Sequence, residues 1–132
     1  MSQENVEIVR QAYLRVLAGE RGPLPDVFDA DAEYRTTPDE PEAGALRGID
    51  EITRGFREFE EAYPDLRSEP VEIKGKGDVV FVWTHLRAHG AASGVPVEWE
   101  YAQVYTLRAG RIIRVVEYLD RAQALRAVGL EE

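Results

Sequence analysis

The 132-residue sequence contains no cysteine, and its acidic side chains outnumber its basic ones. The absence of cysteine excludes disulfides, thiolate metal sites and a cysteine nucleophile. With 16 Lys and Arg against 25 Asp and Glu, the formal net charge is −9. A nucleic-acid-binding protein needs a basic surface that displaces counterions from phosphates. We therefore expect no nucleic-acid partner.

Long hydrophobic runs, repeats and low-complexity segments are also missing. No apolar stretch approaches the roughly 20 residues of a membrane-spanning helix, so we expect no membrane partner. The N-terminal sequence MSQENVEIVR lacks the layout of a signal peptide, which leads us to expect a cytoplasmic protein. No linker divides the chain, and its length is typical of a single domain covering residues 1–132.

Helical periodicity dominates the first half of the sequence. Val6, Val9, Tyr13, Val16 and Leu17 recur at helical spacing and predict an N-terminal helix. The other elements predicted here are a short helix over Pro23–Asp29, a short strand over Glu33–Thr37, a break at Pro38–Pro41 and a helix from Ile49 to Tyr63.

The second half reads as a series of strands separated by turns. The predicted strands cover Ser68–Lys74, Val79–His89, Val95–Leu107 and Ile112–Leu119, and a last short helix capped by Asp120 ends at Gly129. This order predicts an α+β fold in which helices pack on one face of a curved antiparallel sheet. Such a sheet forms a cone, and the open end of the cone is a natural pocket.

Turn chemistry suggests how the last strands pair. A three-residue loop with Gly110 in the left-handed region would set Gln103 opposite Val115 and Tyr101 opposite Glu117. In the preceding hairpin, pairing Gly90 with Ser93 sets Thr84 opposite Trp99, Val82 opposite Tyr101 and His85 opposite Glu98. A slip of one residue would exchange the faces of one strand relative to the other.

These registers divide the strands into two faces. The face predicted to lie under the helices carries Val80, Val82, Thr84, Leu86, Trp99, Tyr101, Gln103, Tyr105, Val115, Glu117 and Leu119. The opposite face carries Phe81 and Trp83, which should not be left in water. We therefore expect a homodimer through the outer sheet face.

Several segments resemble the SnoaL-like branch of the nuclear transport factor 2-like superfamily. They are Glu4–Tyr13 (ENVEIVRQAY), Phe28–Tyr34 (FDADAEY), Arg47–Ile49 (RGI), Tyr105–Ile112 (YTLRAGRI) and Glu117–Arg121 (EYLDR). The resemblance covers nearly the whole chain and implies a cone-shaped, cystatin-like α+β barrel. Its fold is similar to that of ketosteroid isomerases, limonene-epoxide hydrolases and polyketide cyclases, and also to that of non-catalytic binders, so the resemblance does not settle the function.

Two comparisons within that superfamily bear on chemistry. The ending Val115–Asp120 (VVEYLD) resembles that of limonene-epoxide hydrolases, which implies that Glu117 occupies the position of the carboxylate that activates water. Their Arg-x-Asp pattern is replaced here by Thr84-His85-Leu86, and the base of ketosteroid isomerase would fall near Thr36–Thr37, where no carboxylate stands. These two departures count against epoxide hydration and more strongly against isomerisation of the ketosteroid type. The candidate reactions are epoxide hydration, isomerisation and aldol-type cyclisation.

Three residues are candidates for catalysis. An isolated Glu117 in an apolar cone would have a raised pKa and would serve as a general acid or base. Gln103 would orient a ligand carbonyl or hydroxyl, and Tyr101 would donate to a developing oxyanion. The alternatives are that Glu117 points outward or is neutralised by an arginine, and that Gln103 and Tyr101 are ordinary core residues with satisfied hydrogen bonds.

The remaining candidates form the expected ligand-binding wall. They are Tyr13, Tyr34, Phe56, Phe59, Val82, Thr84, Trp99, Tyr105, Val115 and Leu119. Some of these side chains are alternatively plain core.

No metal or cofactor is expected. His85 and His89 stand four apart on one strand, about 13 Å from each other, too far to share a metal. Asp29, Asp31 and Glu33 read as a solvated turn and cap rather than a metal site. No glycine-rich phosphate loop opens a predicted helix.

The sequence favours a protein that binds a small hydrophobic molecule in an apolar cone. We expect a cofactor-independent hydrolase, isomerase or cyclase that uses Glu117 as its general acid/base. The alternatives are a non-catalytic ligand-binding module and a protein-interaction module of the same fold.

Overall fold

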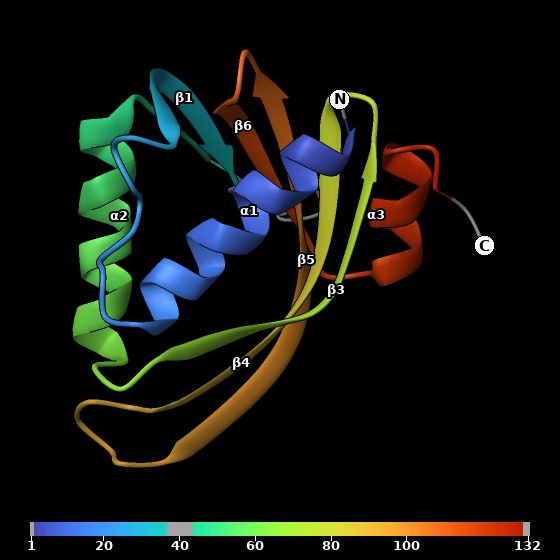
Figure 1. Cartoon of the computed structure of the whole chain (residues 1–132). Helices are drawn as coiled ribbons and strands as arrows, with labels where there is room; N and C mark the ends of the chain where they lie inside the picture. Colours follow the sequence, from blue (N-terminus) through green and yellow to red (C-terminus); the bar gives the residue numbers. More distant parts are fainter. Residues whose placement is uncertain (1, 37–43, 131–132) are drawn as a thin grey trace.

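The computed structural model describes residues 2–36 and 44–130. Its elements in chain order are α1 (Ser2–Leu17), β1 (Phe28–Arg35), β2 (Ala45–Arg47), α2 (Ile49–Ala62), β3 (Arg67–Lys76), β4 (Val79–His89), β5 (Pro96–Arg108), β6 (Arg111–Tyr118) and α3 (Arg121–Ala127). The long sheet bends around α1 and α2, while α3 lies on its outer side (Figure 1). The predicted α+β cone is confirmed.

The sheet is mixed rather than wholly antiparallel. Its six strands lie in the order β2-β1-β6-β5-β4-β3, and β1 runs parallel to β6. The prediction of an antiparallel sheet holds for the other neighbours and is wrong for this pair. The direction of β6 beside β1 depends on the path of the whole chain between them, which local patterns do not contain.

The helix predicted over Pro23–Asp29 is wrong. Only a single turn forms, in which the amides of Val27 and Phe28 both donate to the Leu24 carbonyl at 3.0 Å. Proline has no N–H to give and disfavours helix at the residue before it, so Pro23 and Pro25 do not sustain a helix. β1 consequently begins at Phe28, earlier than predicted, and β2 was not predicted at all. Thr37 and the break predicted at Pro38–Pro41 lie outside the described residues.

Close packing of α2 on the sheet depends on a glycine in the middle of the helix. A Cβ added at Gly55 would come within 2.7 Å of Leu46 Cδ1 in β2. Glycine costs a helix interior about 1 kcal/mol relative to alanine. The close approach of β2 explains why the helix carries it.

The β5–β6 register differs from the prediction by two residues. Ala109 and Gly110 have positive φ values of 53° and 77°, so the hairpin has a two-residue loop and Arg108 pairs with Arg111. A bulge near Leu107 then shifts the pairing and sets Gln103 opposite Glu117, rather than opposite Val115. Because the total shift is even, the predicted faces survive.

The β4–β5 register is also displaced from the prediction by two residues. Thr84 pairs with Tyr101, not with Trp99, because the loop runs from Gly90 to Val95. The faces are again as predicted. His85 Nε2 still contacts Glu98 Oε1 at 2.5 Å, now as a diagonal rather than a direct neighbour.

The outer sheet face is covered in part by α3. Asp120 caps this helix as predicted, accepting hydrogen bonds from the amides of Ala122 and Gln123. Phe81 is fully buried in a cluster with Leu125 and other α3 residues. For Phe81, the helix thus supplies the cover for which the sequence suggested a partner chain, whereas Trp83 stays partly exposed. None of the described helices is long and apolar enough to cross a membrane.

Candidate functional site

A cavity of about 490 Å³ lies between the concave sheet face, α1, α2 and the segment 22–24. The predicted site residues that line it are Glu117, Gln103, Tyr101, Tyr13, Tyr34, Phe56, Phe59, Trp99, Tyr105 and Leu119. The structure therefore brings all three candidate catalytic residues to one cavity.

Three predicted wall residues lie elsewhere. Val82, Thr84 and Val115 are each 0% exposed and belong to the layer beneath the cavity. They share the concave face as predicted but are not among the residues that line the cavity. That they contact a ligand stays a prediction, which their full burial does not favour.

Part of the wall was not predicted. Val9, Ala12 and Val16 come from the inner side of α1, where helical periodicity already indicated an apolar stripe. Gly22, Pro23 and Leu24 come from the segment wrongly predicted as a helix. Leu46 and Ser68 belong to strand positions for which the sequence offered no comparable signal.

Gln103 is the centre of a buried hydrogen-bond network on the cavity floor. Its side-chain Nε2 donates to the Tyr34 hydroxyl at 2.7 Å. Its Oε1 accepts from the Tyr105 hydroxyl at 2.8 Å and from the Tyr13 hydroxyl. Tyr13 also bonds Thr84 Oγ1 at 3.2 Å, so Thr84 holds the network from below. The amide is thereby fixed in one orientation.

This network aims a proton at Glu117. The Tyr34 hydroxyl accepts from the Gln103 amide and donates to Glu117 Oε2 at 2.5 Å. The short distance is typical of a hydroxyl bonded to a carboxylate. The Gln103 Nε2 group can only donate, so the Tyr34 oxygen is the acceptor in that hydrogen bond. The Tyr34 proton therefore points toward Glu117.

The surrounding tyrosines stay protonated at neutral pH. Burial raises the pKa of Tyr13 to about 12. Burial, together with the nearby Glu117 carboxylate, raises the pKa of Tyr34 well above its usual value. Burial likewise raises the pKa of Tyr101 and of Tyr105. All four hydroxyls are therefore neutral hydrogen-bonding groups.

Aromatic rings gather at one end of the cavity. The ring centroids of Phe59 and Trp99 are 6.1 Å apart, and Tyr63 packs against both at 5.1 and 5.7 Å. Phe59 is 41% exposed and Leu119 is 60% exposed, so both lining residues also reach solvent.

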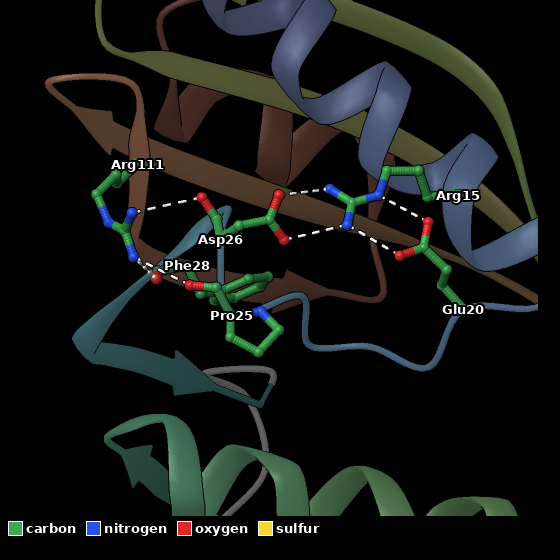
Figure 2. Close-up of polar contacts among 6 residues, drawn as sticks. All are labelled: Arg15, Glu20, Pro25, Asp26, Phe28 and Arg111. Atoms are coloured by element: carbon green, nitrogen blue, oxygen red, sulfur yellow. Dashed lines mark hydrogen bonds and ion pairs between the residues drawn. The ribbon is translucent and has the colours of Figure 1, made fainter.

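The segment that carries Gly22, Pro23 and Leu24 is fixed by arginines from two sides. Figure 2 shows Arg111 donating to the backbone carbonyls of Pro25, Asp26 and Phe28 at 3.0, 3.4 and 2.7 Å. Arg15 of α1 bridges the carboxylates of Glu20 and Asp26 (Figure 2). These arginine contacts, rather than a helix, hold this part of the cavity wall in place.

A second set of arginine contacts joins the same segment to α2. Arg57 donates to the Gly22 carbonyl at 3.0 Å and to Glu60 Oε1 at 3.1 Å. Arg21 contacts the other oxygen of Glu60 at 2.5 Å. Glu60 lines the cavity, and two arginines balance its charge.

The other polar candidates lie outside the cavity. His89 contacts Asp65 at 2.6 Å, as His85 contacts Glu98, and each histidine thus has its own acidic partner. Glu33 does not lie in a solvated turn, because it belongs to β1 and contacts three arginines. Within residues 2–36 and 44–130, no group of three or more metal-binding side chains comes together.

Most of the chain matches one known domain family. A model of the SnoaL-like domain matches residues 9–115. The chain belongs to the SnoaL-like family. The match ends two residues before Glu117, so membership of the SnoaL-like family does not itself assign a role to that carboxylate. No sequence among curated proteins matches the chain.

Solved structures agree with this SnoaL-like fold. A protein from Jannaschia sp. CCS1, provisionally described as a SnoaL-like polyketide cyclase, superposes with a TM-score of 0.78 at 18% identity over 99% of this chain and 95% of that one. An NTF2-like protein of unknown function from Burkholderia pseudomallei K96243 superposes with a TM-score of 0.76 at 20% identity, over 97% of this chain and 98% of that one. AclR from Streptomyces galilaeus, provisionally described as a hydroxylase, superposes with a TM-score of 0.75 at 13% identity, over 100% of this chain and 89% of that one.

Proposed function

We propose that this SnoaL-like protein binds a small hydrophobic molecule in the cavity and uses Glu117 as the general acid/base of a cofactor-independent reaction. The observation that carries the proposal is the hydrogen bond from Tyr34 to Glu117 in a cavity otherwise lined mainly by aliphatic and aromatic side chains. A positioned carboxylate in such surroundings is suited to moving protons of a bound molecule.

Glu117 transfers the proton in this proposal, and neighbouring residues position it and stabilise developing charge. The Glu117 carboxylate takes a proton from the bound molecule or from a water, and it returns that proton to the product. The Tyr34 hydroxyl holds the carboxylate in place, and Gln103 holds Tyr34. The protonated Tyr101 hydroxyl, which also lines the cavity, donates to an oxygen that develops negative charge.

Epoxide hydration, isomerisation and aldol-type cyclisation all fit these roles. The provisional descriptions of two structural relatives, as a polyketide cyclase and as a hydroxylase, support a small organic substrate. At 18% and 13% identity these relatives support no choice among the reactions.

The test is a turnover screen. Small epoxides, enones and polyketide-like ketones are incubated with wild type, with Glu117→Gln and with Glu58→Gln, and the products are read by mass spectrometry. Glu58 is exposed on α2, so its variant makes the same chemical change away from the cavity. We expect product from wild type and Glu58→Gln and none from Glu117→Gln. Equal product from all three proteins would contradict the proposal.

A non-catalytic binder is the second candidate, and the same cavity supports it. In that case a molecule extracted from the purified protein is recovered unchanged after incubation. Recovery of an unchanged ligand, without turnover of that ligand or its analogues, would favour a non-catalytic binding function over an enzymatic one.

We also propose a cytoplasmic homodimer through the part of the outer sheet face that α3 leaves open. Trp83 supports this choice, because it remains partly exposed there while its Nε1 donates to Glu100 at 2.8 Å. Light scattering at micromolar concentration tests the assembly, and a monomer would contradict it.

A further inference from the structure

The charges that line the cavity are all of one sign. Glu60 and Glu117 are its acidic residues, and no lysine, arginine or histidine of the described chain lines it. The chain contains 16 Lys and Arg, so the absence of basic side chains from the lining is not explained by a shortage of them in the sequence. Arg21 and Arg57 contact Glu60 but are not among the residues that line the cavity.

The lining offers negatively charged side chains without offering a positively charged one. The contacts of Glu117 include a hydrogen bond from a neutral hydroxyl, that of Tyr34. A ligand carboxylate or phosphate at this position would face a like charge in a partly desolvated site, which costs free energy. A positive group would instead form a charge-assisted hydrogen bond.

The aromatic side chains favour the same sign of charge. Phe56 packs edge-on against Tyr34 with ring centroids 5.5 Å apart, beside the hydroxyl that reaches Glu117. Trp99 and Tyr101 also line the cavity. The electron-rich faces of such rings attract ammonium groups. The net charge of −9 attracts cations toward the protein in general.

We propose that the cavity selects a hydrophobic amine in its protonated form. Its ammonium group donates to Glu117, and its hydrocarbon part packs against Phe56, Phe59 and Trp99. This inference rests on the ligand-binding part of the proposed function and names the chemical class of that ligand. It does not depend on turnover.

The two tryptophans provide a readout that locates the ligand. Trp99 lines the cavity, whereas Trp83 lies on the outer face, where its Nε1 donates to Glu100. In a proton–nitrogen NMR spectrum the two indole signals are separate probes of these places. The variant Trp83→Phe assigns them.

The experiment titrates three probes of similar shape at 150 mM salt. They are cyclohexylmethylamine, cyclohexylmethanol and cyclohexanecarboxylate. We expect the amine to shift the Trp99 signal and not the Trp83 signal. We expect it to bind at least about tenfold more tightly than the alcohol, and the carboxylate to bind more weakly than either.

Two variants separate the cavity carboxylate from the general negative charge. Glu117→Gln is expected to bring the amine to the affinity that the alcohol has for the same variant. Glu58→Gln removes the same charge from the exposed side of α2 and is expected to change neither.

The outcomes distinguish this inference from the proposed function. Equal affinity of the amine and the alcohol, or an amine preference that survives in Glu117→Gln, would overturn the inference and leave the cavity as a binding site. If no probe shifts the Trp99 signal, the ligand-binding part of the proposed function fails together with the inference. A shift of both indole signals would reveal non-specific binding of the amine and would also overturn the inference.

Discussion

The hydroxyl of Tyr34 in β1 donates a hydrogen bond to the carboxylate of Glu117 in β6, at 2.5 Å. The two residues are 83 positions apart, and the parallel pairing of their strands brings them together. Gln103, opposite Glu117 in the β5–β6 ladder, fixes the hydroxyl from the other side. A carboxylate and its hydrogen-bond donor are thus both held by the sheet.

Replacing Tyr34 with Phe removes the hydroxyl that orients Glu117. We expect kcat/KM for any substrate of the turnover screen to fall about tenfold to a hundredfold, since an unsupported carboxylate samples other positions. The free energy of unfolding should fall by about 1.5–3 kcal/mol, the usual contribution of a hydrogen bond to a charged group. Steady-state kinetics and urea denaturation measure the two effects.

A matched control for this variant is Tyr118→Phe, because Tyr118 packs on the opposite sheet face, beneath α3. It removes a tyrosine hydroxyl without touching the cavity. Loss of activity in Tyr118→Phe comparable to that in Tyr34→Phe would point to a general structural effect and against orientation of Glu117.

Replacing Gln103 with Leu leaves three tyrosine hydroxyls without the partner that joins them. Tyr13, Tyr34 and Tyr105 are each less than 10% exposed, and a buried polar group without a partner costs about 1–3 kcal/mol. We expect urea denaturation to show a loss of about 2–3 kcal/mol. Gln3→Leu, at an exposed position of α1, is the control and should change stability little. A stability equal to wild type for Gln103→Leu would contradict the network.

The buried tyrosines make stability depend on alkaline pH. The pKa of Tyr13 is about 12 in the folded chain against 10.0 for a free tyrosine. Between these values the unfolded chain has released a proton that the folded chain still binds. Stability therefore stays level below about pH 10 and falls above it, by up to about 1.4 kcal/mol per pH unit for this residue.

Urea denaturation from pH 8 to 11.5 measures this slope. Tyr34 and Tyr105 act in the same direction, because their pKa values are also raised by burial. Tyr13→Phe should reduce the slope without removing it. A slope in Tyr13→Phe as steep as that of wild type would refute the part assigned to this residue.

Replacing Arg111 with Ala releases the wall segment shown in Figure 2. The guanidinium donates to three backbone carbonyls between Pro25 and Phe28, so its loss should cost about 1–2 kcal/mol of stability. Hydrogen exchange at the amides of Val27 and Phe28 should become faster. Arg108→Ala, an exposed arginine in the same hairpin, serves as the control. Unchanged exchange in Arg111→Ala would show that these contacts do not hold the segment.

Alternation along the strands was enough to predict which side chains share the concave face. Gln103, Tyr101 and Glu117 were assigned to one face although both hairpin registers were wrong, because each register was displaced by an even number of residues. The displacement near Gly110 arises because Ala109 also adopts a positive φ, which a non-glycine residue rarely does.

Contacts between distant segments were not predictable in the same way. No local pattern indicates that β1 lies parallel to β6, and the Tyr34–Glu117 contact depends on that pairing. The cover of Phe81 by α3 is a second example, since the sequence indicated the helix but not where it packs. The sequence also did not show that Val82 and Val115 are fully buried and do not line the cavity.

The central claim is that Glu117 moves a proton of the molecule bound in the cavity. Its most direct test compares turnover with binding in Glu117→Gln, on whichever neutral probe the wild type converts. We predict that kcat/KM falls at least a hundredfold, while the same probe still shifts the Trp99 indole signal with its affinity within about threefold of wild type. Wild-type turnover by Glu117→Gln, with the probe still bound beside Trp99, would contradict the claim.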